Sequence, residues 1–147
     1  MRFTVLFFML LSYTITGQNI DYNTKKGYAA EGYDVVAYFN NEAKEGHKKH
    51  TTTYDGVNYK FTSEKNLKTF LDSPESYIPQ YGGYCAYAVA LKSKKVSIDP
   101  ETFEIRDCKL YLFYNAWGTN TLKLWKQEQP EELIQKGDKN WDKIKAQ

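Results

Sequence analysis

Cys85 is the residue of this sequence with the widest range of possible chemistry. It lies in the apolar stretch PQYGGYCAYAVA at 79–90, and Cys108 is the only other cysteine. A thiolate can bind a soft metal ion, and it can attack an electrophile when a neighbouring base activates it. In an oxidising compartment Cys85 and Cys108 could instead form a disulfide, if their Cα atoms lie within about 7 Å. The remaining alternative is a buried, unreactive thiol that packs as a small apolar side chain.

A second group with chemical potential is the pair of histidines in HKKH, His47 and His50. A pair formed by Cys85 and His50 could act as a thiolate–imidazolium pair, or as two ligands of copper or another soft metal ion. The bland alternative is that His50 is simply solvated. A thiol enzyme would also need a group that orients the base, and the acidic residues near these motifs are scattered: Asp34, Asp99, Glu101 and Asp107. We therefore expect a binding module and not an enzyme.

Three tyrosines surround the two adjacent glycines of the same stretch. Tyr81, Tyr84 and Tyr87 recur at every third position, so a helix would place them on roughly one face. They could pack in the core with their hydroxyls satisfied, or they could line a pocket for a small ligand. Gly82 and Gly83 allow a close approach of the backbone, although no nucleotide-binding motif accompanies them. These five residues are the candidates for ligand binding.

The two ends of the sequence and its charge limit the class of protein. The opening, MRFTVLFFMLLSYTITGQN, has one basic residue, a short apolar run and then small and polar residues. This pattern predicts a cleaved signal peptide over 1–17 and export to the periplasm or the cell exterior, without a stable membrane anchor. The chain carries 20 Lys and Arg against 18 Asp and Glu. That balance argues against a nucleic-acid-binding protein, which would show a clustered basic face.

The elements that must position these residues indicate an α+β fold. We expect two β-hairpins forming a small antiparallel sheet, packed with several short helices. Residues 18–31 are polar and predict a flexible arm, and GYDVVAYF at 32–39 predicts a strand. Hairpins are predicted over 51–61, around Asp55-Gly56, and over 96–115. Helices are predicted after Thr62 or Ser63, within YCAYAVALK, and twice after Thr119.

Several of these stretches together resemble a known family. They are GYDVVAYF, the segment from YDGVNYKF through PQYGGYCAYAVA, and IRDCKLYLFYN with the Trp-containing helix after it. From about residue 32 to 141 the chain resembles the exported bacterial YHS-domain proteins, so we expect one YHS-type domain over 32–147. The resemblance implies an association with metal handling, above all with copper and other soft metals. It also places His50 near a histidine common in the family, and Cys108 where the family usually has glycine.

The cysteines of metal-binding relatives can be compared with this chain one position at a time. The resemblance aligns their three cysteines with Ala37, Thr62 and Asn66. None of these residues is a ligand that soft metal ions prefer, whereas a structural zinc site needs about four ligands. We therefore keep three hypotheses: a metal- or ligand-binding module, a structural or protein-interaction domain that has lost the metal site, and a thiol-dependent enzyme.

Overall fold

The computed structural model describes residues 19–147, and it confirms the predicted α+β class. The signal peptide predicted for 1–17 lies outside the described residues. The helices are α1 (Glu64–Asp72), α2 (Ala86–Lys92), α3 (Thr121–Gln127) and α4 (Pro130–Ile144). The strands are β1 (Thr24–Lys25), β2 (Tyr28–Ala29), β3 (His47–Tyr54), β4 (Val57–Phe61), β5 (Asp99–Arg106), β6 (Lys109–Phe113), β7 (Asn115–Ala116) and β8 (Thr119–Asn120). Short 3₁₀ turns are η1 (Ala30–Gly32), η2 (Ala37–Asn40), η3 (Pro74–Ser76) and η4 (Gln80–Gly83).

Both predicted hairpins form, but they do not share a sheet. Strands β3 and β4 belong to a four-stranded sheet of order β1-β2-β4-β3, whereas β5 and β6 form a separate two-stranded sheet. The reason lies in the N-terminal segment, because β2 pairs with β4 in parallel, with Tyr28 opposite Asn58. The edge of β4 that a second hairpin would need is therefore already occupied.

The turns of the two hairpins show why they form. Asp55 and Gly56 have φ values of 49° and 77°, and Asp107 and Cys108 have φ values of 49° and 57°. Two consecutive left-handed residues are typical of the two-residue hairpin turn whose twist matches that of its strands. Asp55-Gly56 is a preferred pair for this turn, and Cys108 is an exposed residue that occupies the same position in the second turn.

The segment predicted as a flexible arm is instead bonded to distant parts of the chain from Asp21 onwards. The Asp21 amide donates to the carbonyl oxygen of Lys145 at 2.8 Å, and the Asn23 amide donates to that of Gly82 at 2.9 Å. The Tyr22 hydroxyl donates to Asp55 at the tip of the β3–β4 hairpin. We call residues 20–23 the strap, because they run between the sheet and the C-terminal helix before β1 begins.

The strand predicted over 32–39 is a bridge followed by a turn. Tyr33 pairs with Glu45 in an isolated antiparallel bridge, and η2 begins at Ala37. The cause is Asp34, whose carboxylate accepts the backbone N–H groups of Val36 at 2.9 Å and Ala37 at 3.2 Å. A side chain that binds the amides two and three residues ahead stabilises a turn in place of an extended strand.

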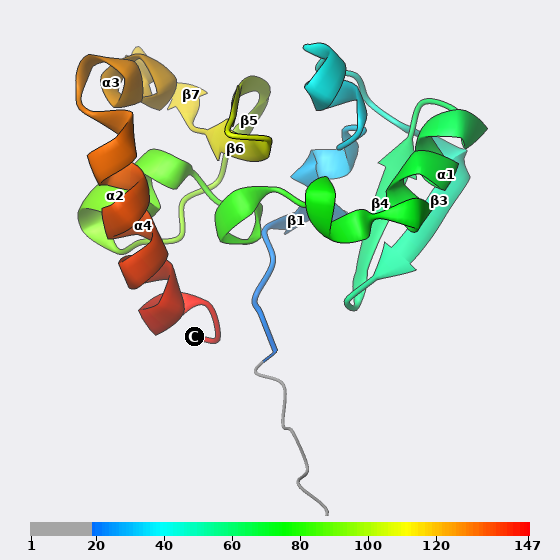
Figure 1. The fold of residues 1–147 in the computed structure, drawn as a ribbon, viewed down its shortest axis with the longest axis horizontal. Coiled ribbons are helices and arrows are strands. Elements are labelled where there is room, and N and C mark those ends of the chain that lie inside the picture. Colours follow the sequence, from blue (N-terminus) through cyan, green and yellow to red (C-terminus); the bar gives the residue numbers. More distant parts are fainter. Residues whose placement is uncertain (1–18) are drawn as a thin grey trace, which may run out of the picture.

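Strand β6 lies between two apolar clusters and contributes to both. Leu110 and Leu112 belong to the cluster around the four-stranded sheet and α1. Tyr111 and Phe113 belong to the cluster formed with α2, α3 and α4. Figure 1 shows these two groups of elements on opposite sides, with β1 between them. Strand β6 is therefore covered on both faces, and it carries apolar residues on both, as a strand in that position requires.

The predicted helix boundaries agree with the capping contacts. The Ser63 hydroxyl accepts the Asn66 amide at 3.1 Å before α1, and the Asn120 side chain accepts the Lys123 amide at 3.1 Å before α3. Pro130 occupies the first turn of α4, where its missing N–H costs nothing. Within residues 19–147, no helix has the length and apolar character that crossing a bilayer requires.

Candidate ligand-binding cleft

Cys85 is fully buried, and its surroundings are those of a packed thiol. Its amide donates to the carbonyl oxygen of Val96 at 2.9 Å, and it forms a parallel bridge with Leu112. The sulfur lies 3.3 Å from the Thr121 hydroxyl oxygen. That hydroxyl already donates its hydrogen to the carbonyl oxygen of Tyr114 at 2.8 Å, so the contact requires the protonated thiol as donor. In this geometry the Cys85 sulfur donates a hydrogen bond inside the packed interior, as a structural thiol does.

The partners predicted for Cys85 are not beside it. An apolar cavity of about 230 Å³ adjoins Cys85, and no histidine lines it. His50 lies on β3, at the opposite side of the molecule from α2, which begins directly after Cys85 (Figure 1). In the part of the chain that the structure describes, no three His, Cys, Asp or Glu side chains are grouped so as to hold a metal ion.

The disulfide considered as one possibility for Cys85 and Cys108 is not formed, because both residues are free thiols. Cys85 is paired with Leu112, four positions beyond Cys108 along the hairpin arm. At about 3.4 Å per residue this separation is roughly 13 Å, beyond the reach of a disulfide. Cys108 is exposed at the hairpin tip, which corrects the prediction.

The three positions that the resemblance aligns with metal-binding cysteines meet at one point, the carboxylate of Asp34. Besides the Ala37 amide, it accepts the Thr62 amide and the Thr62 hydroxyl, each at 2.8 Å. It also accepts the Asn66 side-chain amide at 2.7 Å. Asp34 is fully buried, and no cation pairs with it among residues 19–147. The charge is therefore stabilised by hydrogen-bond donors alone.

The tyrosines predicted to share a helix face point to separate places. Helix α2 begins only at Ala86, and Tyr81 lies in η4 with a left-handed φ of 54°. Each of the three hydroxyls donates to a different carboxylate: Tyr81 to Asp138 at 3.0 Å, Tyr84 to Asp21 at 3.0 Å, and Tyr87 to Glu128 at 2.6 Å. The prediction of one helix face is wrong because the left-handed run at 81–83 redirects the chain before the helix starts.

These contacts fix the tyrosines in the neutral form. Burial, and then the bond to Asp21, raises the pKa of Tyr84 to about 12. The bond to Glu128, and then burial, raises the pKa of Tyr87 to about 12. Burial beside Asp138 raises the pKa of Tyr81 still further above its ordinary value. At neutral pH the three residues therefore act as hydrogen-bond donors and not as bases.

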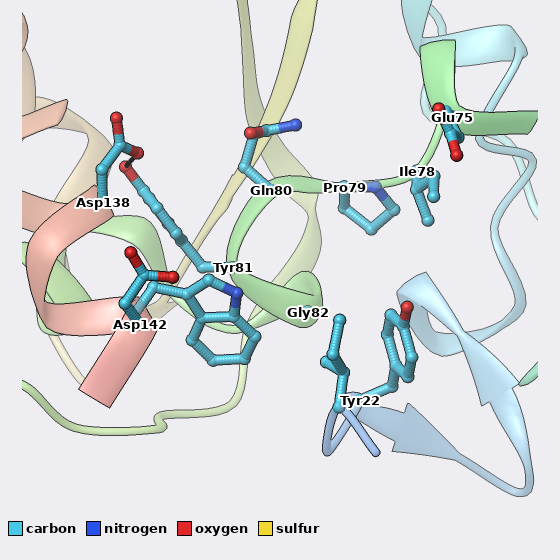
Figure 2. A pocket seen from close by; sticks show the side chains of 11 residues that line it. Tyr22, Glu75, Ile78, Pro79, Gln80, Tyr81, Gly82, Asp138 and Asp142 are labelled. Carbon is cyan, nitrogen blue, oxygen red and sulfur yellow. Dashed lines mark hydrogen bonds between the residues drawn. The ribbon is translucent and has the colours of Figure 1, made fainter. Parts of the chain in front are cut away.

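Tyr81 and Gly82 line a cleft of about 350 Å³, which Figure 2 shows. Three parts of the chain enclose it: the strap, the segment from η3 to η4, and helix α4. The strap contributes Ile20 and Tyr22, and α4 contributes Asp138, Trp141 and Asp142. The middle segment contributes Glu75, Ile78, Pro79, Gln80, Tyr81 and Gly82. The most distinctive motif of the sequence is thus one wall of a cleft.

Two glycines allow the walls of this cleft to approach each other. A Cβ atom on Gly82 would lie 2.8 Å from the Trp141 ring and 3.1 Å from the Asp21 carbonyl oxygen. A Cβ atom on Gly137 would lie 2.5 Å from the Tyr81 hydroxyl oxygen. Both positions therefore need glycine, the first also because its φ is 61°. Gly82 was predicted as a contact residue for a ligand, and its contact with Trp141 shows how it shapes the site.

The cleft is aromatic on one side and negatively charged. Asp138 and Asp142 are one helical turn apart on α4, and Glu75 lies across the cleft from them (Figure 2). Lys145 pairs with Asp142 at 2.9 Å, but no basic side chain is among the residues that line the cleft. The Trp141 indole lines the same cleft. Aromatic faces and carboxylates both attract cations.

A cluster behind the cleft holds Trp141 in place. Lys95 lies 5.7 Å from the centre of the Tyr84 ring and 5.8 Å from that of Trp141. Its ammonium pairs with Asp21 at 2.9 Å. The bond from Lys95, assisted by Tyr84, lowers the pKa of the Asp21 carboxyl below its ordinary value. The ion pair between Lys95 and Asp21 therefore joins the strap to Tyr84 and to Trp141 in the cleft wall.

This lowered pKa predicts a pH-dependent contribution to stability. A carboxyl with a lower pKa in the folded chain stabilises the fold above the unfolded pKa of about 4 and loses that effect as the pH falls. Replacing Asp21→Asn should therefore lower the free energy of unfolding at about pH 6 and have a smaller effect at about pH 3. Because Asp21 is half exposed, we expect a loss below about 1 kcal/mol.

Urea unfolding of both proteins over this pH range measures the difference. Asp72→Asn is the control, because Asp72 is exposed at the end of α1. A gap between wild type and Asp21→Asn that stays constant with pH would contradict this account of the charge pair.

Comparison with known proteins detects a YHS domain in part of the chain. Residues 40–81 match the YHS domain family. No curated protein and no solved structure matches the chain significantly. The matched range holds the β3–β4 hairpin, α1 and η3, and it ends on Tyr81. The match is compatible with metal handling, while Asp34, Cys85 and helix α4 lie outside it.

The sequence indicated the wall of the cleft formed by Tyr81 and Gly82, but not the walls formed by the strap and α4. Asp138 and Asp142 follow the spacing of one helix face, and Trp141 lies between them, so their common location was readable from the helix prediction. Tyr22 carried no such signal, because it lies in a segment that we expected to be flexible. Asp34 appeared only as one of several scattered acids, and its burial gives it a different role.

Proposed function

We propose that this chain is an exported YHS-type binding module whose cleft accepts a small organic cation. The observation that supports this is the combination of the Trp141 indole with the carboxylates of Asp138 and Asp142 on one face of α4. An ammonium group attracted by an aromatic face and paired with a carboxylate gains from both interactions. A volume of about 350 Å³ is at the small end of typical ligand sites, which fits a compact ligand.

The cleft also explains the arrangement of the tyrosine motif. The Tyr81 hydroxyl donates to Asp138 at 3.0 Å and to the carbonyl oxygen of Ile134 at 3.3 Å. The contact with Ile134 fixes the Tyr81 hydroxyl against α4. The contact with Asp138 leaves that carboxylate with one oxygen already bound. The other carboxylate oxygen is then available for a donor on the ligand.

Soft-metal binding is the alternative that the YHS match supports. It needs Cys85 and His50 together, or thiolates at the positions of Ala37, Thr62 and Asn66. The buried Cys85 thiol is hydrogen-bonded to Thr121. Ala37, Thr62 and Asn66 surround the Asp34 carboxylate. The geometry of the cleft therefore supports an organic cation better than a soft metal ion.

The test uses choline and its neutral isostere, 3,3-dimethylbutan-1-ol, in calorimetric titrations. We expect choline to bind, and the neutral alcohol to bind at least about fivefold more weakly, because a cation–π contact contributes about 1–2 kcal/mol. Asp138→Asn keeps the acceptor for Tyr81 and removes the charge, so it should weaken choline binding about fivefold or more. Trp141→Leu should do the same.

The control is Asp72→Asn, which removes an exposed charge on α1 and should leave binding unchanged. Equal binding of choline and the alcohol, or no binding of choline, would overturn the organic-cation proposal. Elemental analysis of untagged protein, followed by Cu(I) titration of wild type, Cys85→Ser and His50→Ala, tests the alternative. Stoichiometric copper that both variants lose would establish the metal site.

A further inference from the structure

The most exposed large apolar side chain of the described residues is Trp117, which is 96% exposed. It occupies the two-residue turn between β7 and β8, followed by Gly118. Its φ is 52°, in the left-handed region, and that of Gly118 is 76°. A left-handed conformation costs a residue with a Cβ atom about 1–2 kcal/mol, and asparagine is the usual residue there. Trp117 therefore adopts a strained backbone conformation although its side chain packs against little else among the described residues.

The surroundings of Trp117 are apolar and basic. Directly after the turn, Thr119 and Leu124 line the apolar cavity of about 230 Å³ between α2 and α3, together with Lys92. Leu124 is 36% exposed there. Lys123, the residue before Leu124 on α3, is also exposed. We call these residues the Trp117 patch.

Few acidic groups offset the positive charge of the lysines in the Trp117 patch. Glu128, at the end of α3, accepts the Tyr87 hydroxyl at 2.6 Å, and no ion pair among residues 19–147 includes Lys92 or Lys123. The patch thus combines an indole at its tip, aliphatic side chains around a cavity, and free ammonium groups.

We infer that the Trp117 patch binds the surface of an anionic lipid bilayer. Indole rings favour the boundary between water and lipid, where the ring is partly buried and its N–H stays hydrated. Lysines beside it are attracted to anionic headgroups, and their long stems can lie along the apolar boundary. The charge also decides against a second copy of the chain. A twofold contact through this patch would place Lys92 and Lys123 near their own counterparts, which repel.

Tryptophan fluorescence tests this inference at the residue concerned. The chain has three tryptophans and none within residues 1–18, and Trp125 is fully buried. Vesicles of phosphatidylcholine with phosphatidylglycerol should shift the emission to shorter wavelength and protect it from acrylamide quenching. Trp117→Phe should abolish both changes and leave the fold intact, because the side chain makes no contact in the core.

Charge reversal supplies the second measurement. Each lysine near an anionic surface contributes about fivefold to partitioning, so Lys92→Glu with Lys123→Glu should weaken binding at least about 25-fold. Lys65→Glu with Lys68→Glu, on the exposed face of α1, is the matched control and should have little effect. Emission that does not respond to anionic vesicles, or that responds equally to pure phosphatidylcholine, would overturn the inference. A shift that depends on protein concentration without vesicles would assign the patch to self-association instead.

Discussion

Replacing Asp34→Ala should lower the free energy of unfolding by roughly 4 kcal/mol or prevent folding, because it removes the acceptor of several buried donors. The amides of Val36 and Thr62 would lose their side-chain partner at once, whereas the Ala37 amide would keep the carbonyl oxygen of residue 34. A buried N–H group left without an acceptor costs about 1–3 kcal/mol, and domains of this size have only about 5–15 kcal/mol in total. Urea denaturation followed by circular dichroism measures the change.

Two further variants keep this prediction testable if the alanine variant does not fold. Thr62→Val removes the hydroxyl that donates to Asp34 at 2.8 Å and accepts from the Asn66 side-chain amide at 3.3 Å, and it should cost about 1–2 kcal/mol. Asp34→Asn keeps the shape, but its amide nitrogen would face the Thr62 amide and the Asn66 side-chain amide, which are both donors. It should therefore be much more costly than the exposed control Asp72→Asn. A loss below about 1 kcal/mol for Asp34→Asn would contradict a structural role for the charge.

Gly137→Ala should destabilise the protein by about 2 kcal/mol, although helix propensity alone predicts the opposite sign. Alanine is favoured over glycine in a helix by about 1 kcal/mol. Here the added Cβ atom would lie 2.5 Å from the Tyr81 hydroxyl oxygen and 2.8 Å from the ring carbon that carries it. Overpacking a fixed ring in this way typically costs 1–3 kcal/mol beyond the propensity gain. Thermal and urea unfolding measure the sign directly.

Tyr81→Phe in the same background identifies the cause. Removing the hydroxyl relieves the closest contact, so the double variant Gly137→Ala with Tyr81→Phe should be more stable than Gly137→Ala alone. Gln135→Ala, exposed in the same helix, is the control and should change stability by less than about 0.5 kcal/mol. A stabilised Gly137→Ala would show that Tyr81 can move away from α4, and that the cleft wall is less fixed than described.

The sequence was sufficient for the elements whose signals are local. The Asp55-Gly56 turn and a helix start after Thr62 or Ser63 each depend on neighbouring residues. The structure confirms the turn and places the cap at Ser63. Such features follow from backbone preferences and from which side chains avoid water.

What the sequence could not supply were contacts between distant segments. The arm at 18–31 has no apolar periodicity, and its order depends on Gly82, Lys95 and Lys145, far along the chain. The predicted strand at 32–39 became a turn because the Asp34 carboxylate binds the amides of Val36 and Ala37. The same carboxylate is held in place by Thr62 and Asn66, which lie far along the chain. Pairing of Cys85 with His50 or Cys108 likewise depended on geometry that the spacing of these residues does not contain.

The strap has a consequence for the order in which this chain reaches its final structure. A hydrogen bond from the Asp21 amide to the Lys145 carbonyl oxygen closes the strap, so one of its contacts spans almost the whole described chain. Contacts of such long range are slow to form, and this one cannot exist before helix α4 has been synthesised. The strap therefore stays unlatched until that helix is in place, and it closes late in folding.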